Sequence, residues 1–182
     1  MVREREEMTR LLDMSTIDVY IDVMAGKPST VLREIKQKKP FASRRQEAFV
    51  ALFRTADQVR SVVAKVLEPH GITPQQYNVL RILRGSHPQG LPTLEIAERM
   101  VERTPGITRL LDRLEAKGLV RRERCPEDRR QVLCWATHEA LVLLAELDTP
   151  VLEADEEALQ NLSRAEVDQL IELLDKIRAE KA

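Results

Sequence analysis

The feature that most constrains the fold is a change in the spacing of apolar residues between residues 92 and 136. Two short stretches place apolar residues three and four apart, which predicts two short helices. Pro92-Thr93 opens the first and Thr104-Pro105 opens the second, with the turn Val101-Glu102-Arg103 between them. The pair predicts a helix-turn-helix, whose second helix, Thr104–Lys117, is the candidate recognition helix.

After Gly118 the pattern changes to an alternation of apolar and polar residues, which predicts two β-strands. The strands cover Leu119 to Arg124 and Gln131 to Ala136, around a charged tip at residues 126–130. A β-hairpin directly after a recognition helix is a wing. Residues 73–137 are therefore predicted to form a winged helix-turn-helix with a two-stranded β wing.

Longer helical patterns flank this segment, so the predicted fold class is mostly α. An apolar stripe from Phe49 to Leu67 predicts a helix over 43–68. Thr73 and Gln76 have the spacing of a capping box that starts the next helix. Residues 138–182 are predicted to form two helices, the first kinked at Pro150 and the second starting at a capping box of Ser163 and Glu166.

Residues 1–42 are predicted to be an N-terminal extension to a domain that covers 43–182. Apolar residues from 11 to 24 indicate one short amphipathic helix, which Gly26 and Pro28 interrupt. Ser29 or Thr30 would cap another short helix that runs to about Lys39.

Charge is distributed unevenly although the net charge is −1. Residues 117–130 hold six basic and three acidic residues, a net +3, whereas residues 146–182 hold four basic and eleven acidic residues, a net −7. The polarity suits a protein that presents its basic middle to phosphates. The sequence has no nucleophile elbow, phosphate-binding loop or paired catalytic carboxylates, so we expect no enzyme and no cofactor.

The order of the predicted elements resembles the multiple-antibiotic-resistance-regulator (MarR) family of DNA-binding transcriptional regulators. The resemblance covers roughly residues 44–181 and rests on residues 107–114, 117–120 and 126–130 together with Thr137. The chain departs from the family in two places: the helix-turn-helix turn lacks a glycine, and no glycine follows Thr137 closely. The extension 1–42 has no counterpart in the family core.

The charged start of the chain, which leads into no apolar segment, and the presence of only two cysteines predict a cytoplasmic protein. The resemblance implies a homodimer that binds a pseudo-palindromic operator in double-stranded DNA and acts as a ligand-responsive repressor. Helices 43–68 and 138–182 would then be the dimerisation helices, and no membrane partner is expected. The resemblance also implies a small, often aromatic or phenolic, effector between the dimer helices and the DNA-reading head. Tyr77 and Arg81 are the candidates for lining that pocket.

The candidate DNA-binding residues lie on the polar side of the recognition helix and at the tip of the wing. They are Thr104, Gly106, Thr108, Arg109, Arg113, Asp128, Arg129 and Arg130. By resemblance, a wing-tip arginine enters or borders the minor groove and is held by an aspartate two residues earlier. Asp128 and Arg130 have that spacing, which favours Arg130 over Arg129.

Two alternative functions remain open from the sequence. A winged helix can serve as a protein-interaction adaptor. Cys125 and Cys134 could make the chain a thiol-based redox-sensing regulator, since Arg124 beside Cys125 would favour a thiolate. A tight hairpin would place Cys125 opposite Arg130 and Cys134 opposite Arg121, so the two thiols are not expected to face each other. The three histidines and two cysteines lack metal-ligand spacing, so no metal is expected.

Overall fold

The computed structural model describes residues 30–102, 106–126, 128 and 130–179 of the chain. It divides into two compact units, Met1–Gln58 and Val59–Ala182. The helix predicted between residues 11 and 24 lies outside the described residues. No helix within the described ranges is long and apolar enough to cross a membrane.

The described part of the first unit holds helix α3 (Val31–Glu34) and the beginning of helix α4 (Arg44–Leu67). The boundaries of α4 confirm the helix predicted over 43–68. The prediction that the preceding short helix reaches Lys39 is wrong, because α3 ends at Glu34. Lys36 has a φ of 54°, a left-handed conformation that a right-handed helix cannot include. An ion pair between Arg54 and Glu34, 3.6 Å between Nε and Oε2, connects α4 to α3.

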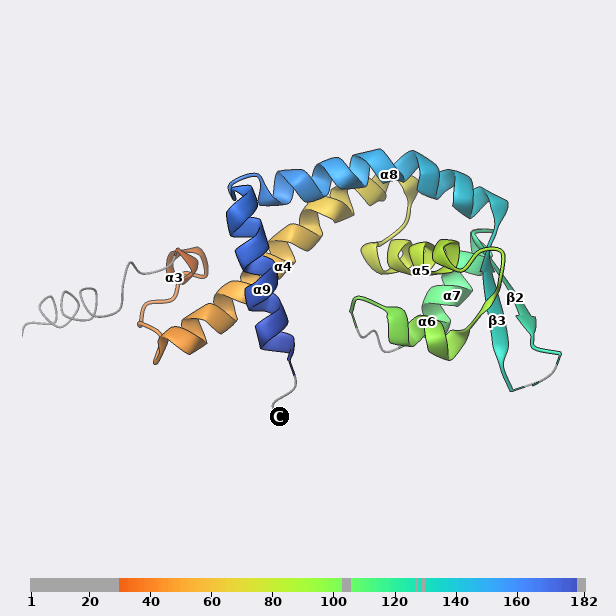
Figure 1. Ribbon diagram of the computed structural model, residues 1–182, viewed down its shortest axis with the longest axis horizontal. Helices are drawn as coiled ribbons and strands as arrows, with labels where there is room; N and C mark the ends of the chain where they lie inside the picture. Colours follow the sequence, from red (N-terminus) through yellow and green to blue (C-terminus); the bar gives the residue numbers. More distant parts are fainter. Residues whose placement is uncertain (1–29, 103–105, 127, 129, 180–182) are drawn as a thin grey trace, which may run out of the picture. The chain divides into compact units, whose positions relative to one another are not determined.

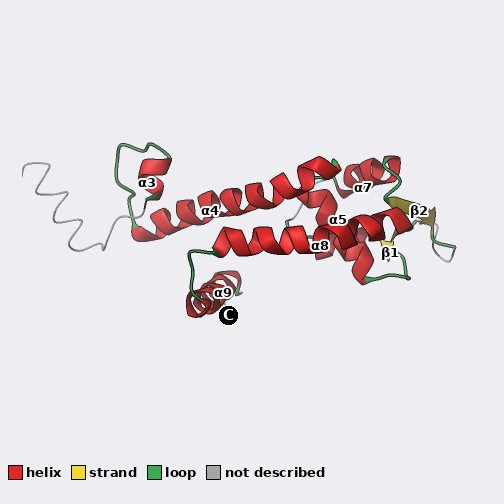
Figure 2. Cartoon of the chain, turned by 90° about the horizontal axis from the view of Figure 1, so that it is seen from above, coloured by secondary structure: helices red, strands yellow, loops and turns green. Residues whose placement is uncertain are grey.

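The second unit begins with the last residues of α4, and its short helices and small sheet lie beneath one end of the long helix α8 (His138–Leu159) (Figure 1). Its elements are η1 (Glu68–His70), α5 (Pro74–Gly85), β1 (Leu91–Pro92), α6 (Thr93–Arg99), α7 (Ile107–Ala116), β2 (Val120–Arg124), β3 (Val132–Ala136), α8 (His138–Leu159) and α9 (Arg164–Arg178). α5, α7 and the strands gather at the same end of this unit (Figure 2). This is the winged helix-turn-helix that the sequence predicts.

Helix starts follow the local sequence signals. Both predicted capping boxes are present: the Thr73 hydroxyl accepts from the Gln76 backbone N–H while the Gln76 side chain accepts from the Thr73 backbone N–H, and Ser163 and Glu166 do the same at α9. Thr137 caps α8 by accepting from the backbone N–H of Ala140. α8 continues through Pro150, and the kink there stays a prediction.

The sheet has three antiparallel strands in the order β1-β3-β2, so the sequence missed β1. A strand of two residues is too short to show an alternating pattern. Leu91 pairs with Cys134 and Pro92 with Leu133, and a proline is tolerated there because β1 is an edge strand. Gly90 leads into β1, and a Cβ atom at that position would lie 2.3 Å from the Trp135 ring. The glycine therefore allows Trp135 to pack against the backbone.

The predicted register of the hairpin is wrong by one residue. Arg122, rather than Arg121, is the partner of Cys134. The backbone N–H of Cys125 donates to the carbonyl of Gln131, rather than lying opposite Arg130. The tip therefore holds five residues, where a tight hairpin would hold four, and Cys125 lies one residue beyond β2.

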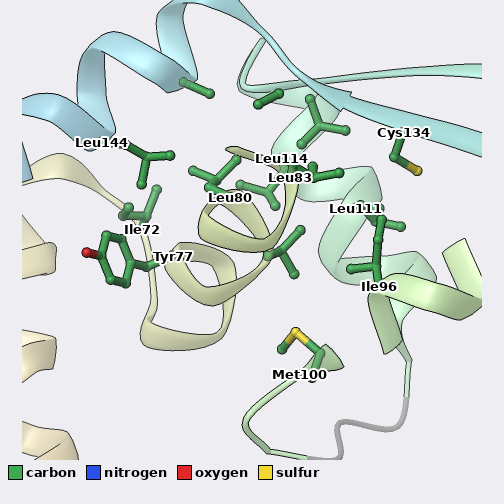
Figure 3. Packing of buried hydrophobic residues seen from close by; sticks show 14 of the residues in the cluster. Ile72, Tyr77, Leu80, Leu83, Ile96, Met100, Leu111, Leu114, Cys134 and Leu144 are labelled. Atoms are coloured by element: carbon green, nitrogen blue, oxygen red, sulfur yellow. The ribbon is translucent and has the colours of Figure 1, made fainter. Parts of the chain in front are cut away.

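The core of the second unit is made by α5, α6, α7, α8 and the inner side of the sheet (Figure 3). Leu80, Leu83 and Ile96 point toward Leu111 and Leu114 of α7, and all five side chains are at most 1% exposed. Full burial of an aliphatic side chain of this size contributes about 1.5–3 kcal/mol. The inner face of α7 is thus fixed in the core, which leaves its other face toward solvent.

Candidate nucleic-acid interface

α7 is shorter than the predicted recognition helix because it begins at Ile107. Its N-cap is Gly106, which has a φ of 93° and so cannot be part of a right-handed helix. The predicted start at Thr104-Pro105 is therefore wrong, and those two residues lie outside the described ranges. At the other end the N–H of Gly118 donates to the carbonyl of Glu115 and the N–H of Leu119 to that of Leu114, a Schellman motif. The sequence prediction that Gly118 closes the helix is confirmed.

The outer face of α7 exposes polar and basic side chains. Thr108, Arg109 and Arg113 are exposed, as is Gly106 at the N-cap, whereas Leu111 and Leu114 on the inner face are fully buried. The described candidates on the recognition helix therefore share one solvent-facing surface. Hydroxyl and guanidinium groups on such a surface are the donors that contact phosphates and the edges of bases.

Asp128 organises the described part of the wing tip through the backbone. Its Oδ1 accepts from the backbone N–H of Arg130 at 3.0 Å, and its Oδ2 accepts from Nε2 of Gln131 at 3.1 Å. The spacing of Asp128 and Arg130 thus brings the two residues together, with the carboxylate binding the main chain of Arg130. The Arg130 side chain is exposed. Arg129 lies outside the described residues.

Ion pairs divide the arginines of α7 and the wing into two groups. Arg109, Arg113, Arg124 and Arg130 make no ion pair with any residue that the structure describes. Arg121 pairs with Glu123, and its guanidinium carbon lies 4.3 Å from the centroid of a Trp135 ring. The positive charge that is available to phosphates is therefore carried by these four arginines, which make no ion pair with a described residue, and not by Arg121.

Arg122 is the residue at this surface whose role the sequence did not predict. It lies in β2 and pairs with both Asp112 and Glu115 of α7, at 2.7 Å and 2.5 Å. The hydrogen bond from Arg122 holds the pKa of the Glu115 carboxyl below its ordinary value. In the sequence Arg122 was one of six bases in a basic segment, and no local spacing distinguishes it from its neighbours.

Tyr77 and Arg81, the predicted pocket residues, both line a cavity of about 270 Å³ in the second unit. The Tyr77 side chain is buried, and burial raises the pKa of its phenol. The Arg81 guanidinium carbon lies 5.9 Å from the Tyr77 ring centroid. Tyr77 is the one aromatic residue that lines the described wall, which agrees with the low aromatic content of the chain.

The cavity is bounded on one side by the turn of the helix-turn-helix. Met100, Val101 and Glu102 line it, and the Asn78 Oδ1 accepts from the backbone N–H of Val101 at 2.9 Å. Nε of Arg60 donates to Oε1 of Glu102 at 2.8 Å. Contacts from α4 and α5 therefore hold the segment that leads toward α7.

The two thiols are both buried, which bears on the redox alternative. Cys134 is fully buried, and desolvation raises the pKa of its thiol. Cys125 is 9% exposed, and neither thiol is part of a disulfide. An activated thiol needs a lowered pKa and access to solvent, and Cys134 has neither. Across the described ranges, no cluster of His, Cys, Asp and Glu residues is arranged to hold a metal ion.

A recognition helix fixed in a core by its inner face, followed by a hairpin with an exposed basic tip, defines a winged-helix DNA-binding protein. A sequence model of the MarR family matches residues 72–132. A MarR transcription factor from Planctomyces limnophilus, known from a crystal structure, is 42% identical with a TM-score of 0.59, over 75% of this chain and 98% of that one. The chain therefore belongs to the MarR family.

Two further proteins extend the comparison. The HTH-type transcriptional regulator MhqR of Bacillus subtilis (strain 168) is 27% identical over 129 residues, which cover 71% of this chain and 88% of MhqR. BpsR of Bordetella bronchiseptica shares the fold with a TM-score of 0.67 and 21% identity, over 79% of this chain and all of that one. The chain is accordingly a DNA-binding transcriptional regulator, and its family consists of transcription factors rather than enzymes.

Proposed function

We propose that this chain is a ligand-responsive repressor that binds a pseudo-palindromic operator as a homodimer in the cytoplasm. The observation that carries the proposal is the outer surface of α7, where Thr108, Arg109 and Arg113 are exposed and neither arginine pairs with a described residue. With the inner face of α7 held in the core, this surface is free to enter a major groove.

In this proposal α7 and the wing contact two different grooves. Arg109 and Arg113 bind guanine edges or phosphates in the major groove, with Thr108 as a further donor. Arg130 extends from the tip toward the minor groove, where a narrow groove concentrates negative potential. Asp128 fixes the backbone of the tip. Thr104, Gly106 and Arg129 complete the proposed contact set.

The proposal of a homodimer rests on apolar side chains that the described chain leaves exposed. In α9, Ile171 is 53% exposed and Ile177 is 67% exposed. In α4, Phe49 and Phe53 are 62% and 63% exposed, and their ring centroids are 4.8 Å apart. A second copy would cover these surfaces and remove them from water. We accordingly propose residues 43–68 and 138–182 as dimerisation segments of a domain covering 43–182, with 1–42 as an extension.

The proposed two-fold axis has a consequence for the operator. It would place two recognition helices in successive major grooves, with half-site centres about 10 bp apart. A dimer bound across a promoter would exclude the transcription machinery, which is the proposed mode of repression.

The proposal of a ligand response rests on the cavity beside Tyr77 and Arg81. Its volume of about 270 Å³ suits one small aromatic or phenolic molecule. The helix-turn-helix turn forms part of its wall, so a bound molecule would act on the segment that leads to α7. In the structural relative BpsR, DNA binding is regulated by 6-hydroxynicotinic acid.

Selection of bound sequences from a random duplex library tests this proposal. We expect enrichment of an inverted repeat with half-site centres about 10 bp apart. The Arg121→Ala variant is the control, because that arginine is paired with Glu123 and should select the same repeat. Binding without enrichment of any sequence, or enrichment of a single unrepeated site, would overturn the proposed function.

A further inference from the structure

One guanidinium group joins the recognition helix to the wing. Nη2 of Arg122 in β2 lies 2.7 Å from Oδ1 of Asp112 and 2.5 Å from Oε2 of Glu115, and Nε lies 3.0 Å from the same Glu115 oxygen. Asp112 and Glu115 are three residues apart in α7, so their side chains lie on the same side of the helix. The Arg122 side chain is 21% exposed.

These contacts account for a placement that helix stability alone does not favour. Glu115 lies in the last turn of α7, where the negative end of the helix dipole disfavours a carboxylate. A carboxylate on a DNA-binding surface is also repelled by phosphates. The hydrogen bond from Arg122 compensates for the unfavourable interaction of Glu115 with the helix dipole. The positive charge of Arg122 is in turn balanced by Asp112 and Glu115.

The same contacts make Arg122 a poor phosphate ligand. Its charge is already shared between two carboxylates, whereas the neighbouring Arg124 is exposed and has no ion-pair partner within the described part of the chain. Arg122 therefore differs from Arg124, which has no such partner among the described residues, and from Arg121, whose partner Glu123 lies on the same strand. Its position connects α7 to β2, and in the proposed function both the helix and the wing contact DNA.

We propose that Arg122 is a positioning residue, which fixes the wing against α7 so that both can engage the same DNA site. β2 leads directly into the tip that carries Arg130, and α7 carries Arg109. A fixed distance between these two elements favours a duplex whose base contacts and groove shape match both at once. This inference rests on the proposed function, since it requires a preferred operator sequence.

The effect of a change at Glu115 separates positioning from simple electrostatics. Glu115→Gln removes a negative charge from the recognition helix, so electrostatics alone would tighten binding to every duplex. That change would leave the ratio of operator to random-duplex affinity as it is in the unmodified protein, whereas positioning by Arg122 requires the ratio to fall about threefold to tenfold. Glu123→Gln is the matched control, because Glu123 is an exposed acid on β2, the strand of Arg122, but pairs with Arg121.

Arg122→Met and Arg124→Met supply the complementary comparison. Arg124→Met should weaken binding to operator and random duplex alike, and should reduce the salt dependence by about one unit if that arginine contacts a phosphate. Arg122→Met should lower the affinity ratio about threefold to tenfold while leaving the salt dependence for random duplex unchanged. Thermal unfolding of each variant monitors the fold, and Glu115→Gln decides the question if Arg122→Met does not fold.

The outcomes separate this inference from the proposed function. An unmodified protein that prefers its operator, with Arg122→Met behaving like Arg124→Met or Glu115→Gln keeping the unmodified ratio of operator to random-duplex affinity, would overturn the positioning role alone. An unmodified protein with no preference for any sequence would overturn the proposed function, and the positioning role would fall with it.

Discussion

α7 and α9 carry similar apolar stripes and differ in what covers them. In α7 the stripe ends in Leu111 and Leu114, which are completely buried, and the exposed side carries arginines. In α9 no residue is buried, and Ile171 and Ile177 are more than half exposed. One helix therefore presents charge to its surroundings, whereas the other presents hydrocarbon.

The difference shows which structural properties an amphipathic sequence pattern can predict and which it cannot. The spacing of apolar residues predicts that a segment is helical and which side avoids water. Whether that side is covered within the chain or by another molecule depends on the tertiary structure. Under the proposed function the exposed charge of α7 binds DNA and the exposed hydrocarbon of α9 binds a second copy.

Leu114→Ala tests the buried side of this comparison and should have the largest effect. Removing a fully buried leucine leaves a cavity in the core, and we expect a loss of about 2–5 kcal/mol in the free energy of unfolding. Urea denaturation followed by circular dichroism measures it. Leu94→Ala is the control, because Leu94 is 71% exposed and its truncation should change stability by less than about 0.5 kcal/mol. Equal losses in the two variants would contradict the described core.

Ile177→Asp tests the exposed side. If a second copy covers α9, a charge at this position should raise the dimer dissociation constant by about tenfold to a hundredfold, as loss of one buried isoleucine implies. Sedimentation at a series of protein concentrations measures the dissociation constant. Gln169→Asp adds the same charge at an exposed polar position of α9 and should leave it nearly unchanged. A chain that is monomeric at micromolar concentration would contradict the dimer.

Arg130→Ala tests the charge at the wing tip. We expect operator binding to weaken by about 1–3 kcal/mol and the salt dependence to fall by about one unit. Fluorescence anisotropy titrations at two salt concentrations measure both quantities. Arg121→Ala serves as the control, since Arg121 is paired with Glu123. If the two variants bind alike, the tip does not contact DNA through Arg130.

The smallest effect is expected for the Cys134 thiol on the inner side of the sheet, which should react little with a thiol reagent. Burial and a raised thiol pKa should keep Cys134 unreactive toward a thiol reagent at neutral pH until the protein unfolds. Titration of the Cys125→Ser variant with Ellman's reagent, with and without urea, reports on Cys134 alone. Rapid reaction in the folded protein would revive the redox-sensing alternative.

Local signals predicted much of the fold, because capping boxes and apolar spacing act over a few residues. The capping box of Thr73 and Gln76 and the glycine that closes α7 are examples. The errors fall where tertiary contacts decide: β1 exists only because β3 lies beside it, and Gly106 adopts a left-handed conformation that delays the start of α7. The pairing of Arg122 with α7 also depends on a strand and a helix meeting in space, so no sequence spacing indicated it.

The central claim is that α7 reads bases, and Arg109→Ala tests it most directly. Arg109 is exposed on the outer face of α7 and makes no ion pair with a described residue, so it is available to a guanine edge. The measurement is the ratio of operator to random-duplex affinity at one fixed salt concentration, with Arg121→Ala as the control. We predict that the ratio falls about fivefold to 150-fold, which corresponds to the roughly 1–3 kcal/mol of discrimination that a bidentate arginine–guanine contact supplies. An unchanged ratio with weaker binding to both duplexes would reduce Arg109 to a phosphate contact, and unchanged binding to both would contradict the assignment of α7 as the recognition helix.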